Sequence, residues 1–322
     1  MVGKLAVVFG GSGFVGRNVV RELLKRDWRV RVAVRRPHQA QFLKPSGAVG
    51  QIQLAQANIR HEASVKDAIA GADAVVNCVG ILFPTGPQNF DAIQADGAAT
   101  IAQHAAKEGV QNFVHVSAIG ADIDGEADYA RTKAAGEAAV REAIPTASIV
   151  RPSIVFGSED SFFNRFAEMS TLSPALPLVG GGNTRFQPVY VDDVADAICT
   201  CLENEDAAGK TYEIGGPTVY TFKELLQLML KETGRSRVLV PIPSPVAPLV
   251  GLVGETAGML PFLDPPITRD QIKLLNKDNV VDASRADGTL EELGVQPTAV
   301  EAILPDYMVR FRKYGQFSER EG

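Results

Sequence analysis

A phenol and an ammonium group stand four residues apart at Tyr129 and Lys133. One helical turn at this spacing places both side chains on the same face. The positive charge of Lys133 is expected to lower the pKa of the Tyr129 phenol. The phenol could then exchange a proton with a substrate oxygen as a general acid or base. Because such pairs also arise by chance, the surrounding motifs must decide what this pair means.

The most informative motif is a glycine-rich turn between an apolar strand at 4–9 and an amphipathic helix at 14–26. Gly10 stands where the chain must turn sharply, Gly13 where a diphosphate must approach the backbone, and Gly16 where the helix must pack against the strand. The helix N-terminus then offers unpaired N–H groups to the phosphates. We therefore predict a dinucleotide site; a strand–turn–helix junction without a ligand is the alternative. Its predicted contacts are Gly10, Gly11, Ser12, Gly13, Phe14, Val15, Gly16 and Arg17.

The end of the second predicted strand indicates which dinucleotide binds. An acidic residue at this place hydrogen-bonds the ribose hydroxyls of NAD. The chain instead reads Val34, Arg35, Arg36, with no carboxylate. Guanidinium groups there, with Arg17 pointing to the same place, would bind a ribose phosphate. We therefore predict NADP(H) in preference to NAD(H), with solvated loop charges as the alternative.

Further cofactor contacts are expected where later strands end, because the carboxyl ends of parallel strands meet at one edge of a sheet. Asn58 and Ile59 follow the third strand and are expected near the adenine. The residues after the fourth strand are expected near the ribose and the diphosphate, and the fifth strand ends at the same edge. These predicted contacts are Asn77, Cys78, Val79, Gly80, Val116 and Ser117.

The segments that must position these residues alternate between strand-like and helix-like patterns. This alternation predicts an α/β fold with a doubly wound parallel sheet, a Rossmann fold, and a smaller interleaved C-terminal lobe. We expect the Rossmann domain over 1–157 with returns at 188–216, and the smaller lobe over 158–187 and 217–322. Capping boxes at Thr221–Glu224 and Thr298–Glu301 predict helix starts, and 173–183 reads as a loop. The expected strands are 29–34, 51–55, 74–77, 112–116, 148–155 and 211–214, and the expected helices are 63–69, 90–108, 129–142 and 191–203.

Composition excludes several other classes of function. The net charge of −6 and the lack of a basic tract argue against nucleic-acid binding. Cys199 and Cys201 would face different sides of a helix, so they make a poor metal pair, and with Cys78 they are expected to be reduced thiols. No apolar run reaches membrane-spanning length. Because Met1 lies only three residues before the first predicted strand, we expect a chain without a targeting segment, or one already processed.

Taken together, these motifs resemble the short-chain dehydrogenase/reductase superfamily in its extended and atypical branches, which include the NAD-dependent epimerase/dehydratases. The resemblance covers most of the chain, and the motifs at 10–16, 129–133, 151–157 and 188–195 follow the family order. It implies that Tyr129, Lys133 and Ser117 are the catalytic residues. It also implies that Val191–Val194 supports the substrate lobe. The segment that it places over the nicotinamide is Arg151, Pro152, Ser153 and Ile154.

The chain departs from that family at the end of the fifth strand. Extended enzymes usually carry a run of hydroxyl residues there, the last of which hydrogen-bonds the substrate oxygen. Here Ser117 is kept, but Ala118 takes the place of the last hydroxyl. Loss of a hydrogen bond to the reacting oxygen lowers a rate by about a hundredfold or more. The resemblance therefore implies cofactor binding with weak or no turnover.

The segments 129–137, 151–153, 156–162 and 268–271 look most like one atypical subgroup, which contains the NADPH-binding accessory subunit of respiratory complex I and its bacterial relatives. That resemblance implies tightly held NADPH in a structural or regulatory role. It also implies complex I or a membrane surface as a partner. The corresponding locations are the cytoplasm, the surface of a bacterial inner membrane, or the matrix side of mitochondria for a mature chain.

Three functions remain open from the sequence. The first is an accessory or assembly subunit with NADP(H) as a bound ligand. The second is an active oxidoreductase or a sugar-nucleotide epimerase/dehydratase that uses Tyr129 and Lys133. The third is an NADPH-sensing regulator. The apolar stretch 241–266 either completes the smaller lobe or forms a surface for a membrane or a protein partner.

Overall fold

The computed structural model describes residues 3–242 and 268–317, which divide into two compact units. Unit 1 consists of 1–152, 191–214 and 281–296, and unit 2 of 153–190, 215–280 and 297–322. The chain therefore passes between the two units several times. The segment 281–296, which the sequence analysis assigned to the smaller lobe, belongs to unit 1. It hydrogen-bonds strand 211–214 through Glu213 N to Gly288 O (3.1 Å) and Asp287 N to Thr211 O (2.8 Å).

Unit 1 contains a seven-stranded sheet in which all described strand pairs are parallel. The strand order is β11-β6-β5-β4-β1-β2-β3, so the direction of winding reverses between β1 and β4. This is the arrangement in which ligands bind beyond the carboxyl ends of the central strands. The predicted doubly wound Rossmann fold is confirmed. The strands are β1 (Leu5–Phe9), β2 (Arg29–Val34), β3 (Ile52–Gln56), β4 (Ala74–Asn77), β5 (Asn112–Val116), β6 (Ser148–Pro152) and β11 (Thr211–Ile214).

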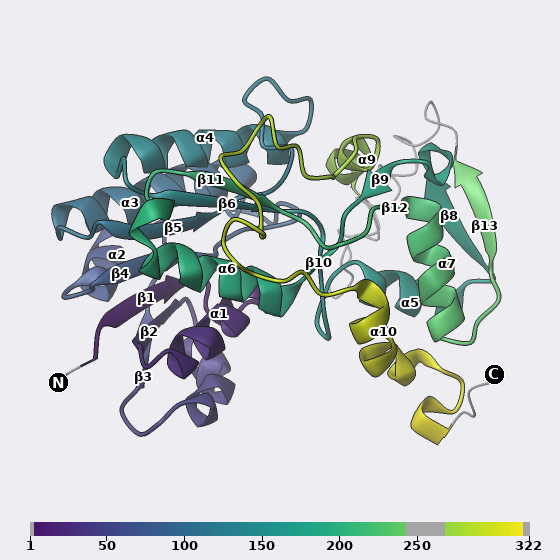
Figure 1. Cartoon of the computed structure of the whole chain (residues 1–322), viewed down its shortest axis with the longest axis horizontal. Helices are drawn as coiled ribbons and strands as arrows, with labels where there is room; N and C mark the ends of the chain where they lie inside the picture. Colours follow the sequence, from purple (N-terminus) through teal and green to yellow (C-terminus); the bar gives the residue numbers. More distant parts are fainter. Residues whose placement is uncertain (1–2, 243–267, 318–322) are drawn as a thin grey trace. The chain divides into compact units, whose positions relative to one another are not determined.

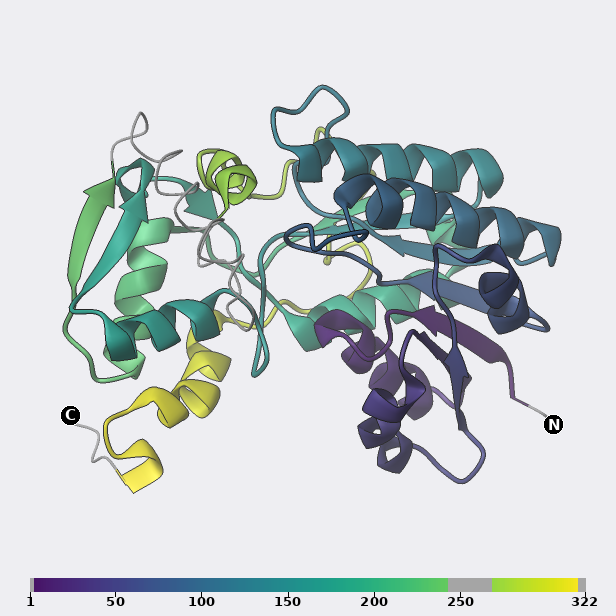
Figure 2. The ribbon, with the colours of Figure 1, turned by 180° about the vertical axis from the view of Figure 1, so that it is seen from behind.

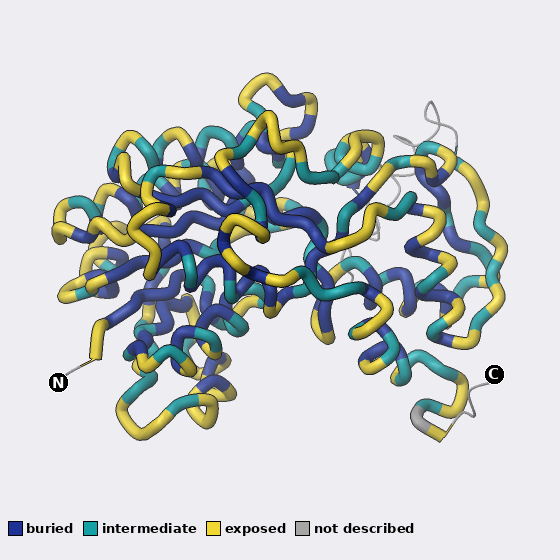
Figure 3. The backbone as a smooth tube through the Cα atoms, in the orientation of Figure 1, coloured by how far each residue is buried: buried dark blue, intermediate teal, exposed yellow. Residues whose placement is uncertain are grey.

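Helices cover both faces of this sheet, α2, α3 and α4 on one face and α1 and α6 on the other (Figures 1 and 2). Strands buried on both faces must be apolar along their whole length, and all five residues of β1 are buried. The tube in Figure 3 shows the central strands as continuously buried. The helices are α1 (Phe14–Lys25), α2 (Glu62–Ile69), α3 (Asp96–Lys107), α4 (Asp128–Ala143) and α6 (Val191–Glu203), with shorter helical turns η1 (Pro37–Ser46), η2 (Asp91–Ala95) and η4 (Glu205–Ala207).

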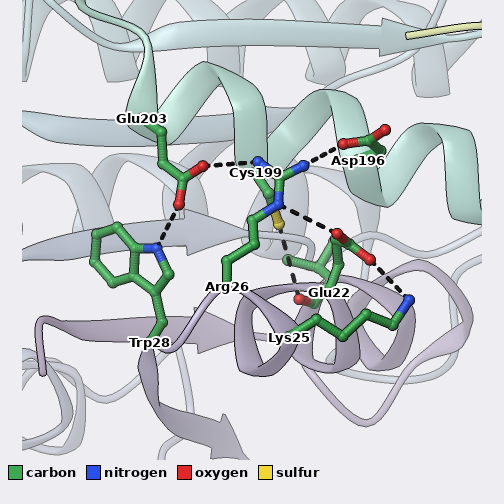
Figure 4. A network of polar contacts seen from close by, with 8 residues as sticks. Glu22, Lys25, Arg26, Trp28, Asp196, Cys199 and Glu203 are labelled. Carbon is green, nitrogen blue, oxygen red and sulfur yellow. Dashed lines mark hydrogen bonds and ion pairs between the residues drawn. The ribbon is translucent and has the colours of Figure 1, made fainter.

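A polar network fixes the C-terminal end of α1 against α6 (Figure 4). The Arg26 guanidinium pairs with Glu22 of its own helix at 3.2 Å, and with Asp196 and Glu203 of α6, the latter at 2.7 Å. The Trp28 indole N–H donates to the other oxygen of Glu203 at 2.8 Å. One guanidinium thus bridges two helices, which restrains the helix whose opposite end forms the glycine turn.

Unit 2 has short strand pairs instead of one large sheet. Its core includes a cluster of aromatic side chains: Phe162 lies with its ring centroid 5.1 Å from Phe163 and 5.3 Å from Phe166, and Phe166 lies 5.4 Å from Phe222. Aromatic rings bury large areas and pack edge to face at such distances. The described elements are β7 (Val155–Phe156), α5 (Phe163–Leu172), β8 (Ala175–Val179), η3 (Gly180–Gly182), β9 (Arg185–Phe186), β10 (Val189–Tyr190), β12 (Tyr220–Thr221), α7 (Phe222–Glu232), β13 (Val238–Ile242), α9 (Arg269–Leu275), α10 (Val300–Met308), η5 (Val309–Phe311) and η6 (Gly315–Phe317).

Two predictions about strands were wrong. The expected strand 148–155 is two strands, because β6 ends at Pro152 and the Ser153 hydroxyl and Ile154 N–H donate to the side chain of Asn279. The expected loop 173–183 contains β8, which pairs in parallel with β13 more than sixty residues later. A pairing so distant along the chain leaves no local signal.

The two predicted capping boxes had opposite outcomes. The Thr221–Glu224 box is confirmed, since Thr221 Oγ1 accepts from Glu224 N and a Glu224 carboxylate oxygen accepts from Thr221 N. The Thr298–Glu301 box is wrong: α10 has Ala299 as its N-cap, and Ala302 N donates to Ala299 O. Most of the apolar stretch 241–266 lies outside the described residues, which resume at 268.

Candidate nucleotide-binding site

The glycine turn has the backbone geometry that close approach requires. Gly10 has a φ of +75°, which an L side chain rarely adopts, and a Cβ there would lie 3.1 Å from the Cys78 carbonyl. A Cβ at Gly16 would lie only 2.3 Å from the carbonyl oxygen of Gly10. The turn is closed by Gly13 N, which donates to Gly10 O at 2.9 Å. Both glycines are therefore needed by the turn itself.

The first turn of α1 has the features of a helix end that can bind an anion. Its N-cap is Gly13, no side chain caps it, and no acidic residue lies in the first turn. The N–H groups of Phe14, Val15 and Gly16 have no partner within the helix at this end. They and the helix dipole favour a negatively charged group in front of the turn.

The arginines predicted to bind a ribose phosphate lie around the ends of β1 and β2. Arg17 donates to the Ser12 carbonyl at 2.8 Å and stacks at 4.7 Å over the ring of Phe42, in the segment that follows Arg36. Arg35 is exposed and donates to the Gln88 side chain, and Arg36 is exposed. The fold thus brings Arg17 to the segment after Arg36, and the phosphate contacts of all three stay predictions.

The residues after β3 and β4 are fixed mainly by local hydrogen bonds. Asn58 N donates to Ser64 Oγ at 3.0 Å, while Ile59 is buried against Gly97 of α3, where a Cβ would lie 2.4 Å from it. Asn77 Oδ1 accepts from Val79 N at 3.0 Å, which shapes the loop up to Gly80. Burial raises the pKa of the Cys78 thiol to about 12, which favours the protonated thiol over the thiolate.

Two buried polar atoms at the end of β5 have no partner in the described part of the chain. They are Ser117 Oγ, a predicted catalytic group, and His115 Nε2, which the sequence analysis missed. Asn77 Nδ2 donates to His115 Nδ1 at 3.1 Å, so the proton of the neutral ring is on Nε2. Burial and the nearby Lys133 lower the pKa of His115 to about 3, which keeps the ring neutral. Leaving buried polar atoms unpaired is costly, so an added polar ligand would be favoured here.

Tyr129 and Lys133 lie one helical turn apart on α4, as predicted. The Lys133 ammonium donates to Val116 O at 3.0 Å and lies 6.0 Å from the centre of the Tyr129 ring. The expected lowering of the phenol pKa was wrong, because burial raises the pKa of Tyr129 to about 12. Burial also lowers the pKa of Lys133 to about 8, against the raising effects of Glu137 and Cys78. Tyr129 is therefore a proton donor at neutral pH rather than a base.

A π-helical turn before α3 positions the Tyr129–Lys133 helix, and the sequence analysis missed it. This turn, η2, presents the buried side chain of Gln94, which donates to Ile81 O at 2.9 Å and accepts from Thr132 Oγ1 at 3.0 Å. A Cβ at Gly136 would lie 2.2 Å from Gln94 O, so α4 packs directly on this turn. Gln94 thereby links the loop after β4 to the residue next to Lys133. Single π-helical turns are frequent at functional sites.

The predicted nicotinamide cover divides between the two units. In unit 1 the Arg151 guanidinium binds both oxygens of Glu137, at 2.9 and 2.7 Å, and lies 3.5 Å from Glu213. The positive charge of Arg151 is thus paired with carboxylates of unit 1 itself. Pro152 is the buried last residue of β6. In unit 2 the side chain of Asn279 accepts from Ser153 Oγ at 2.7 Å and from Ile154 N at 3.0 Å.

The residues present fit a nicotinamide dinucleotide in three respects. The backbone at Gly10 and Gly16 leaves a space that a Cβ would fill, and a helix N-terminus without a capping side chain faces it. Buried polar atoms at the end of β5 have no partner among the described residues. When bound, such a cofactor supplies a hydride acceptor or donor. Within the described residues, no group of three or more His, Cys, Asp or Glu side chains is arranged to hold a metal ion. No helix among residues 3–242 and 268–317 combines the length and apolar character that crossing a bilayer requires.

Comparison with known proteins agrees with this geometry. The sequence pattern described as "NAD dependent epimerase/dehydratase family" matches residues 6–215. A rat protein, NADH dehydrogenase [ubiquinone] 1 alpha subcomplex subunit 9, mitochondrial, is 35% identical over 314 residues, which cover 97% of this chain and 81% of the relative. The protein of the same name from Arabidopsis thaliana is 34% identical, with 97% and 79% covered. The solved structure of an NADPH-dependent quinone oxidoreductase from Escherichia coli has the same fold, with a TM-score of 0.68, 18% identity, and 94% and 98% of the two chains covered.

Proposed function

The chain belongs to the NAD dependent epimerase/dehydratase family, and on that premise we propose that it is an NADP(H)-binding accessory subunit of a respiratory complex I with weak or no turnover. In this function the nucleotide is a held ligand that stabilises one conformation of the chain. The glycine turn would hold the diphosphate through backbone N–H groups, and Arg17, Arg35 and Arg36 would hold a ribose phosphate.

One observation carries the accessory role: two relatives named as complex I subunits align with 97% of this chain at 35% and 34% identity. Likeness over almost the whole chain includes unit 2, which the family pattern at 6–215 covers only in part. The partner proposed from it is a complex I, on the mitochondrial matrix side or at the surface of a bacterial inner membrane. A membrane surface as a second partner stays a prediction.

Weak turnover is supported by the end of β5. Ala118 follows Ser117 at the place where extended enzymes carry a further hydroxyl. Without that group, a reacting oxygen would lack one hydrogen-bond donor, at a cost of about a hundredfold in rate. Binding of the diphosphate at the glycine turn would use backbone N–H groups and would not require the missing hydroxyl.

Native purification tests this function. We expect NADP(H) to co-purify with the chain, to dissociate slowly, and to be accompanied by complex I polypeptides. The preference for NADPH is tested by Arg35→Ala/Arg36→Ala. This variant should bind NADPH about tenfold or more less tightly and NADH nearly as before, because only NADPH has the ribose phosphate that these arginines would contact. Equal weakening of both nucleotides would refute the arginine site. Purification without any nicotinamide nucleotide would refute the function.

A second candidate is an active reductase, and the intact Tyr129–Lys133 pair favours it. Since the Tyr129 pKa is raised to about 12, the phenol can donate a proton to a carbonyl oxygen as hydride arrives. Substrate-dependent loss of NADPH absorbance that disappears in Tyr129→Phe would support this candidate over the accessory role.

A further inference from the structure

Unit 2 contains a groove of about 420 Å³ whose charged lining is entirely basic. Its walls are the exposed face of α7 and the segment that leads into β13. Four cationic side chains line it and no Asp or Glu does, although unit 2 as a whole has 13 Lys and Arg against 13 Asp and Glu. The positive charge is thus concentrated in one place. The lining residues are Lys223, Gln227, Leu230, Lys231, Arg235, Ser236, Arg237 and Leu239.

The two arginines are oriented before any ligand arrives. Arg235 Nε donates to Phe311 O at 3.0 Å, and Arg237 Nε donates to Ser170 O at 2.7 Å. Both side chains are half-buried. Because Nε is held by a backbone carbonyl, little side-chain entropy is lost when the remaining N–H groups bind an anion.

The two lysines lack counter-charges within the described residues. Lys223 and Lys231 are exposed and have no ion pair there. The nearest acidic residues along α7 are already used: Glu224 caps the helix through Thr221, and Glu232 lies 3.7 Å from Arg312. Within the part of the chain that the structure describes, the groove therefore presents positive charge on Lys223 and Lys231 that no carboxylate neutralises.

The spacing of these charges favours an extended ligand. Lys223 and Lys231 are eight residues apart on one helix, which is about 12 Å. A single phosphate cannot contact both ends of such a line. A flat membrane surface would contact the rim of a groove more than its walls. Addition of a strand to β13 is disfavoured, because Pro241 lacks a backbone N–H.

We propose that this groove binds an acidic segment of a partner polypeptide, with carboxylates on the four cations and an apolar side chain over Leu239, the partly exposed leucine of the lining. The proposal rests on the proposed function for the existence of a partner, and it adds the chemistry of that partner. Interface charges of this kind mainly set specificity and the rate of association.

The test uses the full chain and a fluorescent 15-residue peptide of repeating Glu-Glu-Leu. A peptide with Gln in place of Glu is its control. In low salt the Glu peptide should bind at least about tenfold more tightly than the Gln peptide, and Lys223→Glu/Lys231→Glu should weaken it about tenfold. Lys223→Gln/Lys231→Gln, which only removes charge, should weaken it about threefold. Both lysines are exposed, so the fold should be unaffected.

The matched control is Lys66→Glu/Lys107→Glu, which makes the same change in net charge on exposed residues of α2 and α3. Peptide affinity close to that of the unchanged chain is expected. Weakening equal to that of the groove variant would overturn the proposal, and so would binding of inorganic phosphate or phosphatidylglycerol vesicles, but not of the peptide, at the groove lysines. NADPH affinity measured on the same variants reports on the proposed function, so failure of one can be told from failure of the other.

Discussion

The two units differ in how their cores are built. In unit 1 the core consists of aliphatic side chains from parallel strands, such as Val7 and Val75, and from alanines of the covering helices. In unit 2 phenylalanines from several elements, among them Phe163, Phe186 and Phe222, pack with leucines and methionines of β8, α7 and α10. In unit 1 the same pattern of buried aliphatic residues recurs from strand to strand. In unit 2 the packing of the core depends on large side chains that come together from distant parts of the chain.

The units also differ in charge and in the groups they offer to ligands. Unit 1 has 19 Lys and Arg against 25 Asp and Glu, so it carries the whole net charge of −6, and unit 2 is neutral by sequence. Yet the proposed anionic ligand of unit 1 is met by backbone N–H groups and a helix end, while unit 2 uses side-chain cations. A backbone site tolerates an acidic surrounding protein because its positive end is local.

The largest expected effect separates the glycines of the two units. Gly16→Ala places a Cβ 2.3 Å from Gly10 O in unit 1, and Gly216→Ala places one 2.0 Å from Pro188 O in unit 2. Both should lower the melting temperature. Only Gly16→Ala should also lower the affinity for NADPH by about a hundredfold or more, since it would displace the N–H groups proposed to face the diphosphate. Calorimetric titration below both melting temperatures checks this, and equal affinity of the two variants would contradict it.

A second effect compares the buried polar groups of the two units. Glu137→Gln leaves the mostly buried Arg151 with one distant carboxylate, and should lower the free energy of unfolding by about 3 kcal/mol. Tyr307→Phe removes one donor, at 2.7 Å, from Asp160, which keeps backbone donors at Gly157, Phe162 and Asn164. Its expected cost is about 1 kcal/mol. Urea unfolding ranks the two variants, and the reverse order would refute this view of the networks.

The third effect is a pH dependence that belongs to unit 1 alone. Lys133 has its pKa lowered from 10.5 to about 8 in the folded chain. Between these values the unfolded chain binds the extra proton, so the contribution of Lys133 to stability rises with pH through this window, by at most about 3 kcal/mol, and its whole penalty is present below pH 8. The buried thiols, whose pKa values are raised, act in the opposite direction in both chains. Lys133→Met removes only the contribution of Lys133, so the stability of the unchanged chain relative to the variant should rise with pH. Unfolding curves measured from pH 7 to 10 for both chains decide it, because parallel curves would exclude a lowered Lys133 pKa.

Much of unit 1 could be predicted because its signals are local. The strand at 4–9, the glycine turn and the helix at 14–26 are consecutive, and the helix at 191–203 was predicted with its observed bounds. In unit 2 the prediction failed at 173–183, where β8 depends on a partner at 238–242. It failed again at Thr298, where a capping pattern is present but the helix begins beyond it.

At the candidate site, the sequence indicated residue types but not their surroundings. Lys133 was identified from its spacing to Tyr129, but the raised phenol pKa follows from burial, which spacing does not reveal. Nothing in the sequence marks His115 as a site residue, because it lies within a predicted strand of mostly apolar residues. A signal for Gln94 was equally lacking, because a π-helical turn in front of a helix leaves the helical pattern of the sequence nearly unchanged.

The order of strands and helices, the glycine turn and the arginines without an acidic residue at the end of β2 are properties of the sequence itself, because each depends on neighbours a few residues away. Only the tertiary structure decided the electrostatic state of the Tyr129–Lys133 pair, the use of Arg151 inside a buried ion group, and the gathering of four cations in one groove. These features depend on distances between residues far apart in the chain and on exclusion of water, and both are set only once each unit has folded.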